Sequence, residues 1–100
     1  MIGYAVNNAC RLALKDVAFR QALTVDPEAT LRSVRPELTD AEVAAFLNGD
    51  VAALCAMGAH RYLLGFLGRF RLLGLDWDTY VGRLREAYES DPAARTDISP

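Results

Sequence analysis

The sequence predicts an all-α protein, a compact orthogonal bundle of six to seven short helices in a single domain. Its 100 residues are enough for one hydrophobic core and too few for two. Ala and Leu, both strong helix formers, account for 16 and 14 of these residues. Every periodic segment has the apolar spacing of a helix, and none alternates as a half-buried strand does. We therefore expect a helical domain over residues 1–91 and a polar tail over residues 92–100, which hold two of the four prolines.

Apolar spacing and capping residues predict three helices in the first third of the chain. The first two cover residues 4–14 and 17–23. Asp26 is a good N-cap and Pro27 a good first helical residue, so a third helix is expected over residues 27–34. It must end before Pro36, because a residue that precedes proline avoids helical geometry.

The middle of the chain carries a complete set of start and stop signals. Thr39 and Glu42 form a capping box, in which each side chain bonds a backbone N–H group at the start of the helix. That helix begins at residue 40 and ends at Asn48-Gly49, since glycine readily adopts the left-handed geometry of a helix end. Asp50 is the N-cap of a short helix over residues 51–57, which Gly58 ends.

Two further helices are expected before the tail. A longer one covers residues 59–73, and its two glycines, Gly65 and Gly68, each cost about 1 kcal/mol relative to alanine. Such glycines are typical of a kink or of a close crossing between helices, and we expect one of these there. Asp76 caps the last helix, which ends where Asp91-Pro92 breaks the helical pattern.

Charge and composition exclude several classes of partner. The chain has 11 basic and 13 acidic residues, a net charge of −2, and neither half has the excess of cations typical of nucleic-acid-binding proteins. No apolar stretch is long enough to span a bilayer, and the N-terminal residues do not resemble a signal peptide. We therefore expect a cytoplasmic protein that binds neither nucleic acid nor membranes.

The supply of metal-ligating residues is small. Protein sites for zinc, copper or non-haem iron use several His or Cys side chains, whereas this chain has one histidine, His60, and two distant cysteines. No nucleophile elbow or phosphate-binding loop is present. We expect no metal or cofactor in this chain and no catalysis by the chain alone. Cys10 and Cys55 are interpreted as small buried apolar residues, with a disulfide as the alternative.

Three stretches, taken together over about residues 3–88, resemble a known family. The first is Gly3-Tyr4 with Asn7, followed by Phe19-Arg20; the second is Leu38-Thr39-Asp40-Ala41-Glu42 with Asn48-Gly49-Asp50, Leu54, Gly58-Ala59 and Tyr62-Leu63-Leu64; the third is Leu75-Asp76-Trp77-Asp78-Thr79-Tyr80. This pattern is similar to the LigA family, the small α subunit of protocatechuate 4,5-dioxygenase and related class III extradiol ring-cleaving enzymes.

The resemblance implies a role as an accessory subunit. In that family the small subunit is all-helical and holds no iron, while the β subunit supplies two His and one Glu to Fe(II). The small subunit packs against the β subunit and helps to cover the active site. This chain departs from the protocatechuate-type pattern at Leu73-Gly74-Leu75, where a longer connection would reach toward the substrate. That departure puts a direct substrate contact in doubt.

We expect the docking surface on the helix over residues 59–73. Apolar residues cover nearly its whole circumference, and so small a domain leaves one of these apolar faces exposed. The predicted partner-binding residues are His60, Arg61, Phe66, Arg69, Phe70, Arg71, Trp77 and Tyr80. Without a partner, we expect the chain to self-associate through this face. Each residue also has a structural interpretation: a surface histidine, solvated arginines, and core aromatic rings. Asn7 is interpreted as a structural hydrogen-bonding residue.

Two other functions fit the same sequence. One is a recognition module similar to the leader domains of some ribosomally made, modified peptides, which dock onto a modifying enzyme and share a comparable helix cap and Gly-Asp corner. Such a precursor carries a modifiable peptide after the domain, whereas residues 92–100 are short and polar. The other is a free-standing family member that has no partner and self-associates.

Overall fold

Seven α-helices make up the computed structural model, which describes residues 3–90. They are α1 (Tyr4–Lys15), α2 (Val17–Val25), α3 (Pro27–Arg32), α4 (Asp40–Leu47), α5 (Val51–Ala56), α6 (Arg61–Arg69) and α7 (Trp77–Ser90). The described residues contain no strand, so the all-α prediction is confirmed. The tail predicted over residues 92–100 lies outside this range.

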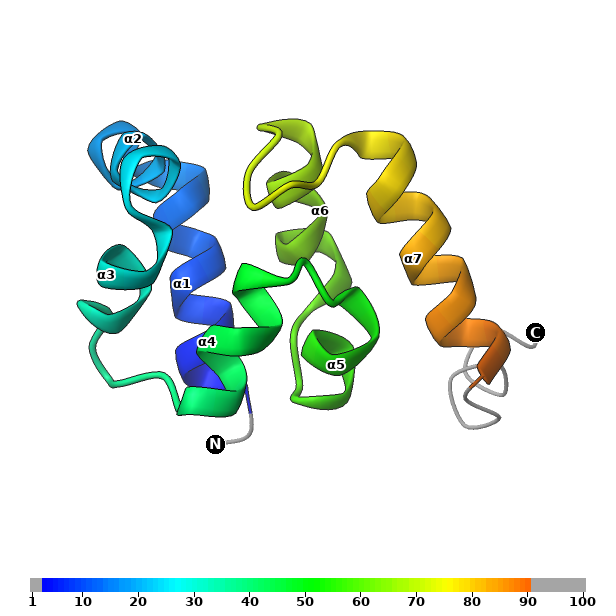
Figure 1. Cartoon of the computed structure of the whole chain (residues 1–100). Coiled ribbons are helices and arrows are strands. Elements are labelled where there is room, and N and C mark those ends of the chain that lie inside the picture. Colours follow the sequence, from blue (N-terminus) through cyan, green and yellow to red (C-terminus); the bar gives the residue numbers. More distant parts are fainter. Residues whose placement is uncertain (1–2, 91–100) are drawn as a thin grey trace.

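Helices α1 and α6 pack side by side at the centre of the bundle (Figure 1). Helices α2 and α3 lie on the far side of α1, and α7 lies on the far side of α6. Helices α4 and α5 connect the two halves, with α4 packed on α3 and α5 packed on α7. Apolar side chains from all seven elements meet between these layers, and Phe46, Leu54 and Leu64 are among the most deeply buried. No helix in the described part of the chain is long and apolar enough to cross a membrane.

Six of the seven helices begin at a side chain that accepts a hydrogen bond from the first turn. These N-caps are Asp16, Asp26, Thr39, Asp50, His60 and Asp76. At α4 the full capping box is present, with the Glu42 N–H donating to Thr39 Oγ1 at 3.1 Å and the Thr39 N–H donating to Glu42 Oε1 at 2.8 Å. The predicted box is therefore confirmed.

Three helices end in the same hydrogen-bonded turn, which combines a 6→1 and a 5→2 backbone bond around one left-handed residue. Gly49 and Gly58 occupy that left-handed position after α4 and α5, as the sequence predicts. After α6 the position is taken by Arg71, with φ 56°. The Arg71 N–H donates to the Gly68 carbonyl and the Leu72 N–H to the Leu67 carbonyl.

The prediction of one helix over residues 59–73 is therefore wrong at both ends. Helix α6 covers only Arg61–Arg69, and a connection over residues 70–76 follows it. The connection turns back so that Leu72 and Leu75 reach the core, where both are buried. Burial of both leucines offsets the cost of left-handed geometry at Arg71 and Leu73, about 1–2 kcal/mol for each residue that is not glycine.

The amide side chain of Asn7 fastens α1 to the turn that precedes α6. Its Nδ2 donates to the Gly58 carbonyl at 3.1 Å, and its Oδ1 accepts from the His60 N–H at 2.7 Å. One turn earlier, Gly3 lies against the same Gly58, where a Cβ atom on Gly3 would be 2.5 Å from the Gly58 carbonyl oxygen. The interpretation of Asn7 as a structural hydrogen-bonding residue is confirmed.

Replacing Asn7 tests this fastening. We expect Asn7→Ala to lower the free energy of unfolding by about 1–3 kcal/mol, because it leaves the Gly58 carbonyl and the His60 N–H without their partner. The matched control is Asn8→Ala, which removes a single exposed bond of 3.2 Å to the Arg35 carbonyl and is expected to cost less than about 1 kcal/mol. Urea denaturation of both variants gives the comparison, and equal losses would contradict the special role of Asn7.

Candidate functional site

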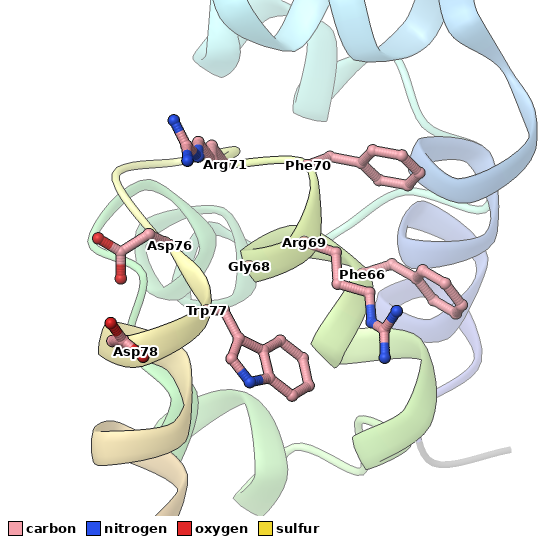
Figure 2. Close-up of a pocket in the computed structure, with 8 residues that line it drawn as sticks. All are labelled: Phe66, Gly68, Arg69, Phe70, Arg71, Asp76, Trp77 and Asp78. Carbon is pink, nitrogen blue, oxygen red and sulfur yellow. The ribbon is translucent and has the colours of Figure 1, made fainter.

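A wide surface groove lies where the end of α6, the connection over residues 70–76 and the start of α7 meet (Figure 2). It is open to solvent and has a volume of about 990 Å³. Its lining residues are Phe66, Gly68, Arg69, Phe70, Arg71, Asp76, Trp77 and Asp78. Figure 2 shows the Arg69 side chain between the rings of Trp77 and Phe66, while the carboxylates of Asp76 and Asp78 point to the opposite side.

A row of aromatic rings follows α6 along this groove. The rings of Tyr62 and Phe66 meet edge to face at 5.2 Å, and those of Phe66 and Phe70 stack at 6.2 Å. Tyr62 is 70% exposed, Phe70 40% and Trp77 46%. A second cavity of about 250 Å³ shares Phe66, Arg69 and Trp77 with the first and extends it toward the start of α6. We call the surface formed by Tyr62, Phe66, Phe70 and Trp77 the aromatic face.

Guanidinium groups rest on the aromatic rings around this surface. Arg69 lies 5.0 Å from the centre of the Trp77 ring, and Arg61 lies 5.0 Å from that of Tyr88. Arg20 lies 4.2 Å from the Phe70 ring centre, and its Nη1 also donates to the Ala13 and Leu14 carbonyls at the end of α1. These positions are attractive because the face of an aromatic ring carries negative partial charge.

None of these arginines forms an ion pair within residues 3–90. The ion pairs in that range are Arg32–Glu28, Arg32–Asp40 and Arg35–Glu37, all of them on or beside α3. Asp76 is one of the two acidic residues that line the groove. Its carboxylate accepts a hydrogen bond from the Thr79 backbone N–H, and this bond, with a smaller contribution from the charge of Arg71, lowers the pKa of the carboxyl below its usual value. Asp76 is thus committed to capping α7.

The floor of the groove is a close crossing of α6 and α7. A Cβ atom on Gly68 would lie 3.0 Å from Tyr80 Cβ and 3.1 Å from the Asp76 carbonyl oxygen, so only glycine fits without displacement. At Gly65 the nearest atom would be 3.5 Å away, an ordinary contact. The close crossing predicted from the two glycines is confirmed at Gly68.

Tyr80 departs from its predicted place on the docking surface. Only 3% of the residue is exposed, and its hydroxyl donates to the Arg61 carbonyl at 2.9 Å beneath the groove. Burial raises the pKa of this phenol. Tyr80 therefore supports the aromatic face from the core and reaches the surface only at the bottom of the smaller cavity.

The other predicted site residues fall into two groups. Phe66, Arg69, Phe70, Arg71 and Trp77 line the 990 Å³ groove, and Arg61 lines the smaller cavity. His60 lies at the opposite end of α6, where its Nδ1 accepts from the Tyr62 N–H at 3.2 Å and caps the helix. The geometry matches the structural interpretation of His60.

Sequence reasoning missed Tyr62, which belongs to the aromatic face, and Arg20, which lies over the ring of Phe70. The four-residue spacing of Tyr62 from Phe66 and of Phe66 from Phe70 would have identified Tyr62. No local signal places Arg20 over Phe70, because these residues meet only when α2 packs beside the end of α6.

Both cysteines are free thiols. Cys10 is fully buried, and burial raises its pKa to about 12, so the thiol is neutral and behaves as a small apolar residue. Cys55 is half-buried, and burial raises its pKa as well. Within the described residues there is no cluster of three or more His, Cys, Asp or Glu side chains.

Comparisons of this chain with protein-family models, with curated proteins and with solved structures find no match.

The crossing at Gly68 yields a direct stability test. We expect Gly68→Ala to lower the free energy of unfolding by about 1–3 kcal/mol, because the added methyl group collides with Tyr80 and the Asp76 backbone. The matched control is Gly82→Ala in α7, where a Cβ atom has no neighbour within 4 Å. That change is expected to stabilise the helix by up to about 1 kcal/mol. Thermal unfolding of both variants gives the comparison. Midpoint temperatures that shift in the same direction for Gly68→Ala and Gly82→Ala would contradict the close crossing at Gly68.

Proposed function

We propose that this chain is the small, non-catalytic subunit of a two-component extradiol dioxygenase, a cytoplasmic enzyme that opens catecholic aromatic rings. It packs on a separate catalytic subunit and covers that subunit's Fe(II) site. The starting point is the resemblance of residues 3–88 to the LigA family. The structural observation that carries the proposal is the exposed aromatic face on α6 and α7.

This surface has the composition of a protein-docking site. Trp, Tyr and Arg are enriched among the residues that dominate binding energies at interfaces. Exposed, contiguous apolar surface rimmed by polar groups is characteristic of interaction sites. Trp77, Tyr62 and Phe70 expose large parts of their rings within one continuous groove, with Arg61 and Arg69 at its edges.

The residues that carry the family resemblance divide into two groups. Asn7 fastens α1, Thr39 and Glu42 cap α4, and Gly58 ends α5, so these residues hold the fold. Tyr62 and Trp77 lie on the aromatic face itself. The one histidine caps α6. Because a facial iron triad requires two histidines and a carboxylate, we assign the iron and the ring-opening step to the partner.

Co-expression with the protein encoded beside this chain tests the proposal. We expect the pair to purify as a complex with stoichiometric iron and to open a catechol, which is followed by the absorbance of the ring-opened product. The chain alone is expected to show neither property. Ring opening by the purified chain alone would contradict the proposal, as would a neighbouring protein that modifies peptides and retains this chain.

Without a partner, the aromatic face is expected to cause weak self-association. Light scattering at tens of micromolar should show dimers or larger species, and Tyr62→Glu or Phe66→Glu should return the chain to a monomer. Val25→Glu is the matched control, because Val25 on α2 is 85% exposed and lies outside the aromatic face. A wild-type chain that is strictly monomeric, or equal effects of the variants and the control, would contradict this expectation.

A further inference from the structure

We infer that the groove along α6 and α7 binds an acidic amphipathic helix of the partner, with apolar side chains on the aromatic face and carboxylates on the surrounding arginines. The inference deepens the proposed function and rests on it, because it takes the chain to be one subunit of a complex. It does not depend on the partner's iron or on its chemistry.

The spacing of the rings suits a helical segment. Tyr62, Phe66 and Phe70 recur every four residues, so the row extends over roughly 12 Å at the helical rise of about 1.5 Å per residue. An amphipathic helix laid along α6 presents its own apolar residues at i, i+4 and i+7 or i+8 over the same length. The two cavities that share Phe66, Arg69 and Trp77 form one open groove beside this row.

The floor of the groove contains Gly65 and Gly68 and is held in place by contacts between α6 and α7. The close crossing at Gly68 and the hydrogen bond from Tyr80 to the Arg61 carbonyl hold α6 and α7 together beneath the aromatic face. Helix α6 continues into a connection whose first left-handed residue, Arg71, lies in a turn closed by two backbone hydrogen bonds. A preformed groove of this kind loses little conformational entropy when a partner binds.

The charge around the groove favours an acidic partner. The chain as a whole has a net charge of −2, yet Arg20, Arg61 and Arg69 surround the rings and form no ion pair within residues 3–90. Contact with aromatic rings orders these guanidinium groups, which then offer several donors to a carboxylate in fixed geometry. The two acids of the groove, Asp76 and Asp78, point away from Arg69 and the rings (Figure 2).

The same charges disfavour a second copy of this chain as the natural occupant. In a symmetric dimer the same surface of each copy contacts the other. Both copies would then bring the same positively charged rim to the contact, and like charges brought near one another weaken association. Salt therefore separates the two occupants: it should strengthen contact between copies by screening repulsion, and weaken contact with an acidic helix by screening attraction.

Trp77 reports binding directly, because it is the only tryptophan in the chain and its ring is 46% exposed at the groove. The probe is a synthetic helix of about 15 residues with leucines at i, i+4 and i+8 and glutamates on either side of them, a length sufficient for a helix on binding. One control peptide has lysines in place of the glutamates. A second has the same composition as the probe, but its leucines do not share a face.

We expect the acidic amphipathic peptide to shift Trp77 emission to shorter wavelength and the two control peptides not to do so. The double variant Arg61→Glu, Arg69→Glu should weaken peptide binding by about tenfold or more, since two attractive contacts become repulsive. Arg11→Glu on α1 changes the charge of an exposed arginine outside the groove and should bind as the wild type does. Circular dichroism establishes that each variant keeps its helical content.

Three results would overturn the inference. The first is binding of the lysine peptide with the same affinity as the acidic one. The second is binding by the double variant as tight as that by Arg11→Glu. The third is tight self-association that salt strengthens and that blocks the peptide. The test is separate from that of the proposed function. If the acidic peptide does not bind but the co-expressed complex opens a catechol, the subunits make contact at another surface. If the peptide binds but the partner is not a dioxygenase, the proposed activity is wrong and the inferred groove stands.

Discussion

The two hydrogen bonds of the Asn7 amide connect residues more than fifty positions apart and set where α6 begins relative to α1. Gly3 and Gly58 make this approach possible, because a side chain on Gly3 would collide with the Gly58 backbone. Once the start of α6 is held there, the positions of its two faces follow. One face packs on α1 and the core (Figure 1), and another carries the aromatic row of Tyr62, Phe66 and Phe70.

Most of the fold could be predicted because residues close to each helix end determine where that helix begins or ends. Thr39 and Glu42 cap α4, and Gly49 and Gly58 end helices by the same turn, which glycine adopts at no steric cost. The end of α6 lacked such a signal, because Arg71 takes the left-handed position and its sequence neighbours Leu72 and Leu73 read as helix formers. Burial of Leu72 and Leu75, a tertiary effect, decides the geometry there.

The candidate site was predictable in part for a related reason. Its aromatic and arginine residues are close in sequence on α6 and at the start of α7, so their helical spacing brings most of them together. Tyr80 was placed wrongly on the surface because spacing alone does not say which side of α7 faces α6. Arg20 was missed because its contact with Phe70 depends on how α2 packs. Among the residues that resemble the LigA family, Asn7, Thr39 and Gly58 hold the fold, whereas Tyr62 and Trp77 lie on the docking surface.

Hydrogen–deuterium exchange on the complex with the catalytic subunit tests the central claim, that the α6–α7 groove is the docking surface. Backbone amides over residues 61–77 should exchange more slowly in the complex than in the isolated chain. Those of α3, on the other side of α1, should exchange at the same rate in both. Protection of α3 with no change over residues 61–77 would show that the partner binds another face and would contradict the account.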